Sequence, residues 1–299
     1  MLNLELLSVV SDISEDCRPF GISPDGQFIA AAPNSQPSIV QLKNFDGKVY
    51  KEFLGHKDKI YSIDFSGDGR TIASASADKS VRIWSPTGEL YTLFDRFDSA
   101  VAVVKFAADV PILAAGEVSG LIVLFDIAGN YIATLHSPKG QILDLAWSKD
   151  SGLLAASCAD GKLYLYKITD QIKKVYPHPG PVFGAGFSLS DGRISGVWKL
   201  ISASNDGQIR YINLDDDTVK TIAAHKGPAV SIAVSNDGNF IATASLDRSI
   251  KIFDAYGNLK YAVELSDEPL SLMLSSGGTY LYSIVRPNKI HIYKITSKA

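Results

Sequence analysis

A short motif recurs seven times along this chain, and its regular spacing constrains the fold more than any other feature of the sequence. Each copy combines an alternating apolar run, a turn of the Ser-x-Asp-Gly type and a run of small residues. Successive turns begin 43, 41, 41, 40, 47 and 40 residues apart. A period near forty residues indicates an array of small β-rich units rather than one domain with a single core. The turns begin at Ser23, Ser66, Ala107, Ser148, Ser188, Ser235 and Ser275.

The second unit, residues 55–94, shows what one repeat predicts. Its inner runs are almost continuously apolar or small, so both faces of the resulting sheet must be covered by other parts of the protein. One sheet cannot cover itself, whereas sheets stacked face to face around an axis cover one another. No amphipathic helical period is present, and we predict an all-β ring of four-stranded units. The strands expected in this unit are 60–65, 72–76, 81–84 and 89–93.

The same unit resembles the signature of the WD-repeat β-propeller family, which has Gly-His near the start of a unit and Trp near its end. The matching residues are Gly55-His56, Ser74, Asp78 and Trp84, and the sixth unit repeats them as His225, Thr243, Asp247 and Phe253-Asp254. The resemblance covers the whole chain. It implies a single seven-bladed β-propeller over residues 1–299, with four-stranded antiparallel blades. The blades cover approximately residues 11–54, 55–94, 95–135, 136–176, 177–223, 224–265, and 266–299 together with 1–10.

The last blade of this arrangement needs a strand from elsewhere in the chain. The seventh unit supplies only three strand-like runs, at 270–274, 280–285 and 290–295. The apolar run 2–10 precedes the first unit and has no partner there. By resemblance to the family, we expect this N-terminal strand to pair into the last blade and to close the ring.

His56, Ser74 and Asp78 are the residue types of a hydrolase triad. A nucleophilic serine needs a base, an orienting acid, an oxyanion hole and an accessible cleft. Ser74 instead lies in a run of small residues, and the same residue types recur in the sixth unit, which a single active site would not explain. The resemblance implies a structural hydrogen-bond network in each of these blades, and no catalytic residue is expected. The network residues are His56, Ser74, Asp78, Trp84, His225, Thr243 and Asp247.

Composition limits the choice of partners. The formal net charge is −3, which disfavours a protein whose main task is to neutralise phosphates. Cys17 and Cys158 fall in units far apart around the ring, so a disulfide between them is not expected, and a reducing, cytoplasmic setting fits best. No apolar run is long enough to cross a bilayer, and no His or Cys pair has the spacing of metal ligands. We expect no cofactor, no metal and no membrane partner.

Without an active site, function should reside on loops. In the family that the chain resembles, the loops entering each unit and those between its second and third strands crowd one face around the central channel. Aligning each unit with the second assigns an apolar centre and a cationic rim to this face, as is typical of peptide-docking surfaces. Alternatively, several of these side chains turn inward and pack. The candidate partner-binding residues are Arg18, Lys59, Tyr61, Leu143, Phe183, Val230, Leu246, Leu270 and Arg286.

The sequence therefore favours a non-catalytic scaffold or adaptor that docks a peptide or protein segment on the channel-entrance face, as a component of a larger complex. Two alternatives remain: a propeller-type enzyme with a site in the channel, and a nucleic-acid-binding module. The fifth unit also carries an insertion at 191–196, with Trp198 beside it. This Trp is either a further contact point or a side chain folded back onto its own blade.

Overall fold

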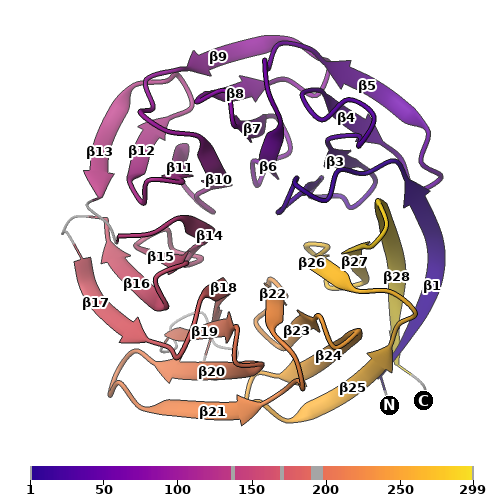
Figure 1. Ribbon diagram of the computed structural model, residues 1–299, viewed down its shortest axis with the longest axis vertical. Helices are drawn as coiled ribbons and strands as arrows, with labels where there is room; N and C mark the ends of the chain where they lie inside the picture. Colours follow the sequence, from indigo (N-terminus) through magenta and orange to yellow (C-terminus); the bar gives the residue numbers. More distant parts are fainter. Residues whose placement is uncertain (1, 136–138, 169–171, 190–197, 298–299) are drawn as a thin grey trace.

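The computed structural model is a closed ring of β-sheets around a central axis (Figure 1). It describes residues 2–135, 139–168, 172–189 and 198–297. Within these residues it contains seven four-stranded antiparallel sheets, which confirms the predicted seven-bladed β-propeller. The described part of the chain has no helix long and apolar enough to span a membrane. The 191–196 insertion lies outside the described residues, as does the side chain of Trp198.

Each blade is named here by its strands, from the innermost strand outward. The first four blades contain β2 (Gly21–Ile22), β3 (Ile29–Ala31), β4 (Val40–Lys43), β5 (Val49–Phe53); β6 (Ile60–Phe65), β7 (Ile72–Ser76), β8 (Val81–Trp84), β9 (Leu90–Phe94); β10 (Val101–Phe106), β11 (Ile112–Glu117), β12 (Ile122–Asp126), β13 (Tyr131–Leu135); and β14 (Ile142–Trp147), β15 (Leu153–Cys158), β16 (Lys162–Lys167), β17 (Ile172–Pro177). The last three contain β18 (Val182–Leu189), β19 (Trp198–Ser204), β20 (Gln208–Asn213), β21 (Val219–Ala223); β22 (Ala229–Val234), β23 (Phe240–Ser245), β24 (Ser249–Asp254), β25 (Leu259–Glu264); and β26 (Pro269–Leu274), β27 (Tyr280–Val285), β28 (Lys289–Ser297), β1 (Leu2–Ser11).

The Ser-x-Asp-Gly motif forms the turn between the first and second strands of a blade. In the first blade the hydroxyl of Ser23 donates to Asp25 Oδ1 at 2.6 Å, and the same carboxylate oxygen accepts the backbone N–H of Gln27. Gly26 follows with a φ of 72°, a conformation that glycine adopts without steric cost. The Ser66, Ser148 and Ser235 turns contain the same Ser-to-Asp hydrogen bond. The repeat seen in the sequence is thus a repeated turn chemistry.

The hydrophobic cores lie between blades rather than within them. In the described residues, buried side chains group into seven clusters, and each cluster draws on two neighbouring sheets. One of them combines Val40 and Phe53 of the first blade with Ile60 and Trp84 of the second. Each such side chain contributes about 1.5–3 kcal/mol when fully buried. Every blade therefore depends on both of its neighbours for stability.

The ring closes through the N-terminal strand, as predicted. β1 runs antiparallel to β28, and nine of its residues, from Leu2 to Ser11, have partners in β28. The first and last described residues, Leu2 and Ser297, are paired across these two strands (Figure 1). The Nζ of Lys43, on β4, donates to the backbone carbonyls of Ser11 and Asp12, each at 3.2 Å. These bonds tie the end of β1 to the first blade, so one segment connects the last blade with the first.

Deleting residues 1–10 should lower the melting temperature by about 5 °C or more, because β28 becomes an unpaired edge and the packing of Leu2, Leu4 and Val10 is lost. A synthetic peptide of residues 1–11, added in excess, should restore part of the loss, since it binds only the folded ring. Leu7→Ser is the matched control, because the Leu7 side chain is 45% exposed at the bulge of β1. An unchanged melting curve for the truncated chain would contradict the closing role of β1.

Candidate functional site

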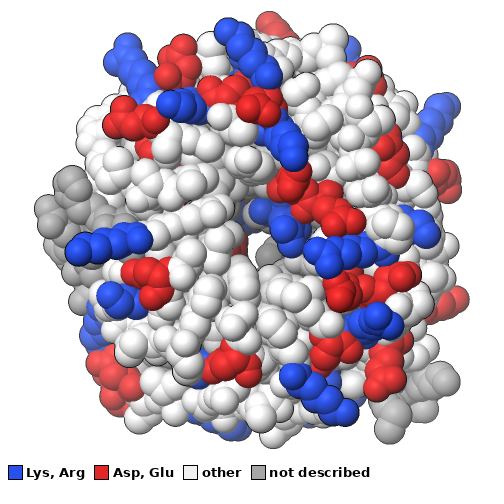
Figure 2. All heavy atoms as spheres, in the orientation of Figure 1, with Lys and Arg blue, Asp and Glu red and all other residues white. Residues whose placement is uncertain are grey.

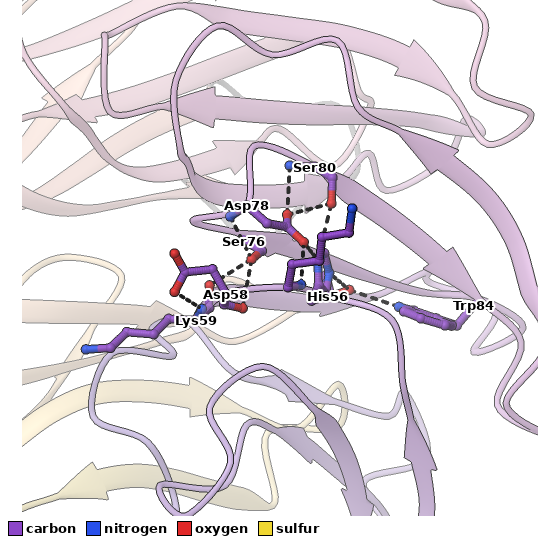
Figure 3. Close-up of polar contacts among 9 residues, drawn as sticks. His56, Asp58, Lys59, Ser76, Asp78, Ser80 and Trp84 are labelled. Carbon is purple, nitrogen blue, oxygen red and sulfur yellow. Dashed lines mark hydrogen bonds and ion pairs between the residues drawn. The ribbon is translucent and has the colours of Figure 1, made fainter.

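The second blade contains a chain of hydrogen bonds that joins the loop before it to two of its strands (Figure 3). His56 Nδ1 lies 2.8 Å from Asp78 Oδ2, and His56 Nε2 lies 2.8 Å from Ser74 Oγ. The indole N–H of Trp84 donates to the same hydroxyl at 2.9 Å. A proton on His56 Nδ1 satisfies every member, because Ser74 then accepts from Trp84 and donates to His56.

This arrangement is unsuited to nucleophilic catalysis, although its residue types match a triad. The Ser74 side chain is completely buried on strand β7, and its hydroxyl is engaged by both Trp84 and His56. A substrate could not reach it without unfolding the blade. Burial alone would raise the pKa of Asp78, but hydrogen bonds from His56, Ser80 and the backbone N–H of Lys57 hold it well below its usual range. The carboxylate thus acts as an acceptor that organises the loop.

The sixth blade has an equivalent series of hydrogen bonds. His225 Nε2 lies 2.8 Å from Thr243 Oγ1, and His225 Nδ1 lies 2.9 Å from Ser249 Oγ and 3.5 Å from Asp247. Phe253 stands where the second blade has Trp84, so the outermost donor is missing. Burial lowers the pKa of His225 to about 4, which keeps the imidazole neutral at neutral pH.

In two other blades, different residues replace parts of this hydrogen-bond network. In the fifth blade His178 Nε2 lies 2.8 Å from Ser202 Oγ, while Arg210 forms an ion pair with Asp206. In the fourth blade the phenol of Tyr164 donates to Asp160 at 2.6 Å. Arg210 and Tyr164 occupy the same position of their blades, on the third strand. The family signature contains neither Arg nor Tyr at this position, so the sequence pattern does not predict these substitutes.

The second candidate site is the central channel, a cavity of about 970 Å³ lined by residues of all seven blades. At its mouth each blade presents one side chain from the same register position, five residues before the first turn of the unit. We call these residues the bulge ring. All seven line the cavity: Arg18, Tyr61, Ala102, Leu143, Phe183, Val230 and Leu270.

A β-bulge sets the position of the ring residue in six of the blades. In the second blade Ile60 faces Ser76 and Ser62 faces Ala75, so Tyr61 has no partner on β7. The innermost strands of the third to seventh blades shift register at the equivalent residue. Such a bulge turns a side chain out of the regular alternation of a strand, here toward the channel. In the first blade Arg18 precedes the strand, and its backbone N–H donates to the carbonyl of Tyr61 at 2.7 Å.

Six of the nine partner-binding candidates belong to the bulge ring, and their exposure differs. Arg18 is exposed, and Tyr61, Leu143, Phe183 and Val230 are half-buried. Leu270 is only 3% exposed and packs between the last and first blades. Sequence reasoning did not name Ala102, although Ala102 also lies five residues before the first turn of its unit. Three candidates do not line the cavity: Lys59, Leu246 and Arg286.

Those three candidates are held by other residues. Lys59 pairs with Asp16 at 2.8 Å, and Arg286 pairs with Glu15 at 3.1 Å and with Glu268. Leu246 packs against the cluster between the last and first blades. Figure 2 shows charged side chains crowded beside the opening over the β2–β5 and β26–β28 sheets, whereas the rim over β14 and β18 is largely uncharged. The mouth therefore has a charged side and an apolar side.

Below the bulge ring, polar side chains link the innermost strands of neighbouring blades. Ser62 Oγ accepts the backbone N–H of Val104, and Ser231 Oγ accepts that of Leu272. Asp144 likewise accepts the N–H of Ala185 at 3.2 Å, and burial raises its pKa to about 6. These bonds satisfy N–H groups that would otherwise be unpaired at the sheet edge. Among the described residues, no group of three His, Cys, Asp or Glu side chains is arranged to hold a metal ion.

His56→Ala should lower the free energy of unfolding by about 1–3 kcal/mol, because Asp78 and Ser74 each lose a buried hydrogen-bond partner. Urea denaturation of the purified variant measures this. Lys57→Ala is the matched control, since its side chain is exposed and only its backbone N–H contacts Asp78, so a change within about 0.5 kcal/mol is expected. Equal stability of both variants would refute the structural role of His56.

His225 should make stability depend on pH in a defined window. The unfolded chain protonates this imidazole near the ordinary pKa of 6.5, whereas the native state resists until about pH 4. Its contribution is therefore complete above pH 6.5 and is lost as the pH falls to 4, by at most about 3 kcal/mol. Urea titrations of wild type and His225→Gln at several pH values should converge as the pH falls. If the free energies of unfolding of the two proteins differed by the same amount at every pH, a neutral, buried His225 would be contradicted.

Comparison with known proteins agrees with these features. The family model described as "WD domain, G-beta repeat" matches residues 47–85, 129–167 and 216–254. Each matched segment begins with the outermost strand of one blade (β5, β13 or β21) and continues through the three inner strands of the next. Each repeat thus spans two blades, which is the same arrangement that leaves β1 to complete the last blade.

Curated relatives are distant but similar over most of this chain. The nuclear distribution protein PAC1 of Arthroderma otae is 23% identical over 274 residues, covering 86% of this chain and 54% of the relative. Apoptotic protease-activating factor 1 of Rattus norvegicus is 23% identical over 75% of this chain and 18% of its own length. The U5 small nuclear ribonucleoprotein 40 kDa protein of Dictyostelium discoideum is 26% identical, over 68% and 45% respectively.

The chain therefore spans about half the length, or less, of these relatives. Their similarity follows the repeats, as does the match to the family model. The turn chemistry, the His–Ser–Asp–Trp chain of the second blade and the closure through β1 belong to the same architecture. Together these findings show a seven-bladed β-propeller in which three segments match the WD-repeat family model and whose distant relatives are WD-repeat proteins.

Proposed function

We propose that this chain is a non-catalytic interaction scaffold or adaptor that docks a peptide or protein segment at the bulge ring. The observation that carries the proposal is that six blades each use a β-bulge at the same register position to turn a side chain into the channel mouth. Packing between blades accounts for Leu270, which belongs to the cluster between the last and first blades, and in part for Val230. Tyr61, Leu143 and Phe183 belong to none of the clusters found among the described residues. Bulges of this kind commonly re-aim side chains at binding sites.

The chemistry of the ring supports binding rather than catalysis. Its seven positions hold four aliphatic residues, one Phe, one Tyr and one Arg, and this set contains no acid–base pair. Half-buried aromatic and aliphatic side chains with an arginine beside them are the usual components of protein-docking surfaces. Ser74, which has triad-like neighbours in the second blade, is completely buried within that blade.

The relatives support the same class of function. They are WD-repeat proteins whose names are not those of enzymes, and one is named as a protein of a small nuclear ribonucleoprotein. By analogy, we propose that this chain works within a larger complex and that its direct partner there is a protein. A net charge of −3 weighs against nucleic acid as that partner. The free, buried thiols of Cys17 and Cys158 are compatible with the reducing, cytoplasmic setting that we propose.

Site-specific photocrosslinking in the native host tests the docking surface. A benzophenone amino acid in place of Phe183 should give a light-dependent adduct with a partner protein, because Phe183 lines the mouth. The matched control replaces Tyr50, which is 68% exposed on the outer strand β5. Adding Leu143→Glu should remove the adduct at 183 while leaving the melting temperature nearly unchanged, because Leu143 lines the mouth and belongs to none of the clusters between described blades. Adducts that form from position 50 but not from 183 would place docking on the outer rim and refute the proposal.

A further inference from the structure

The bulge ring is asymmetric in a way that bears on the chemistry of its ligand. In sequence order around the ring, Arg18 and Tyr61 stand on adjacent blades, and the fourth and fifth blades lie across the channel from Arg18 (Figure 1). Those blades present Leu143 and Phe183, followed by Val230 on the sixth. One wall of the mouth therefore presents a cation at its ring position, and the ring positions of the opposite wall are apolar.

Arg18 differs from the neighbouring cations of this face. Lys59 and Arg286 pair with carboxylates, whereas the Arg18 guanidinium forms no ion pair with any of the residues that the structure describes. Its backbone is nevertheless fixed, because its N–H donates to the carbonyl of Tyr61 and Pro19 accepts the N–H of Ile63 at 3.0 Å. A guanidinium stays charged at any physiological pH and offers a planar fork of donors. The mouth thus presents a cation whose backbone is fixed and whose guanidinium N–H donors can bind a ligand.

The surroundings of Arg18 carry charges of both signs. Asp16 and Glu15 act electrostatically on Arg18 and offset its positive charge, whereas Arg286 acts in the opposite sense, so a ligand with a single negative charge suits this balance. A carboxylate carries one negative charge and matches the guanidinium fork in a bidentate geometry. Because Arg18 is exposed at the entrance rather than deep in the channel, a segment lying across the mouth reaches it without inserting its end.

Resting on the docking function proposed above, we propose that the bulge ring binds an internal peptide segment in which an acidic side chain stands next to a large apolar one. The carboxylate pairs with Arg18, and the apolar side chain contacts Leu143, Phe183 and Val230 on the opposite wall. Charge complementarity thus sets the acidic preference, and burial of the apolar side chain supplies most of the affinity.

Selection from a display library of random internal peptides tests this specificity. Wild-type protein should enrich peptides that contain Asp or Glu within two positions of Leu, Ile, Phe or Met. For a selected peptide, Arg18→Ala should weaken binding about 10-fold or more, and replacing the peptide's Glu with Gln should do the same, without further loss when both changes are combined. Arg70→Ala, an exposed arginine beside the turn at the other end of the strand, is the matched control and should leave binding unchanged.

Other outcomes would contradict the proposed ligand, or both the ligand and the docking function. Acidic enrichment that persists in Arg18→Ala, or enrichment confined to a second library with free carboxyl termini, would refute the proposed ligand. Peptides without acidic residues whose binding is abolished by Phe183→Glu would refute it as well, while leaving the docking function intact. Selected peptides that are indifferent to both Arg18→Ala and Phe183→Glu, or a library that yields no specific peptide, would contradict both proposals.

Discussion

No blade of this ring can bury its own two faces, and the rest of the structure depends on that constraint. Each of the seven hydrophobic clusters among the described residues draws on two neighbouring sheets, so a blade without its neighbour would expose side chains such as Trp84 and Phe53 to water. The contacts are complete only when the last blade meets the first. Pairing of β1 with β28 joins these two blades through one segment, and Lys43 fastens the end of that segment to the first blade.

The same constraint explains where buried polar side chains occur. The innermost strand of each blade has a free edge along the channel, where backbone N–H groups lack a partner strand. Ser62, Asp144 and Ser231 supply acceptors to the next blade at this edge, and Asp64 accepts both the N–H of Phe106 and the ammonium of Lys105. Carboxylates inside a channel would ordinarily indicate catalysis or ion binding. Here their geometry accounts for them as inter-blade acceptors.

The repeat and its turn residues predicted the number of units and their β-strands, because these depend on local turn chemistry and on the need to cover two apolar faces. The closure by β1 was expected from the resemblance to the WD-repeat family. Alignment of the seven units with one another also located six of the seven bulge-ring residues. It could not show that Arg286 is paired, since its partner Glu15 lies 271 residues away in sequence. Nor could it show that Tyr164 substitutes in the fourth blade, because that contact needs the pairing of β15 with β16 as well as the side-chain direction.

The β-bulge distinguishes positions that packing between blades constrains from the position that lines the channel mouth. Residues on the regular faces of the strands are constrained by the adjoining blade, and changing their size creates cavities or strain. The bulged residue leaves that alternation, and in the second, fourth and fifth blades it lines the channel without joining a cluster between blades. Leu270 of the last blade is the exception, because it packs against the first blade. Positions as different as Ala102, Phe183 and Arg18 therefore occupy one structural role. Under the docking function proposed above, single substitutions at this ring would change the ligand while the architecture that presents them stays the same.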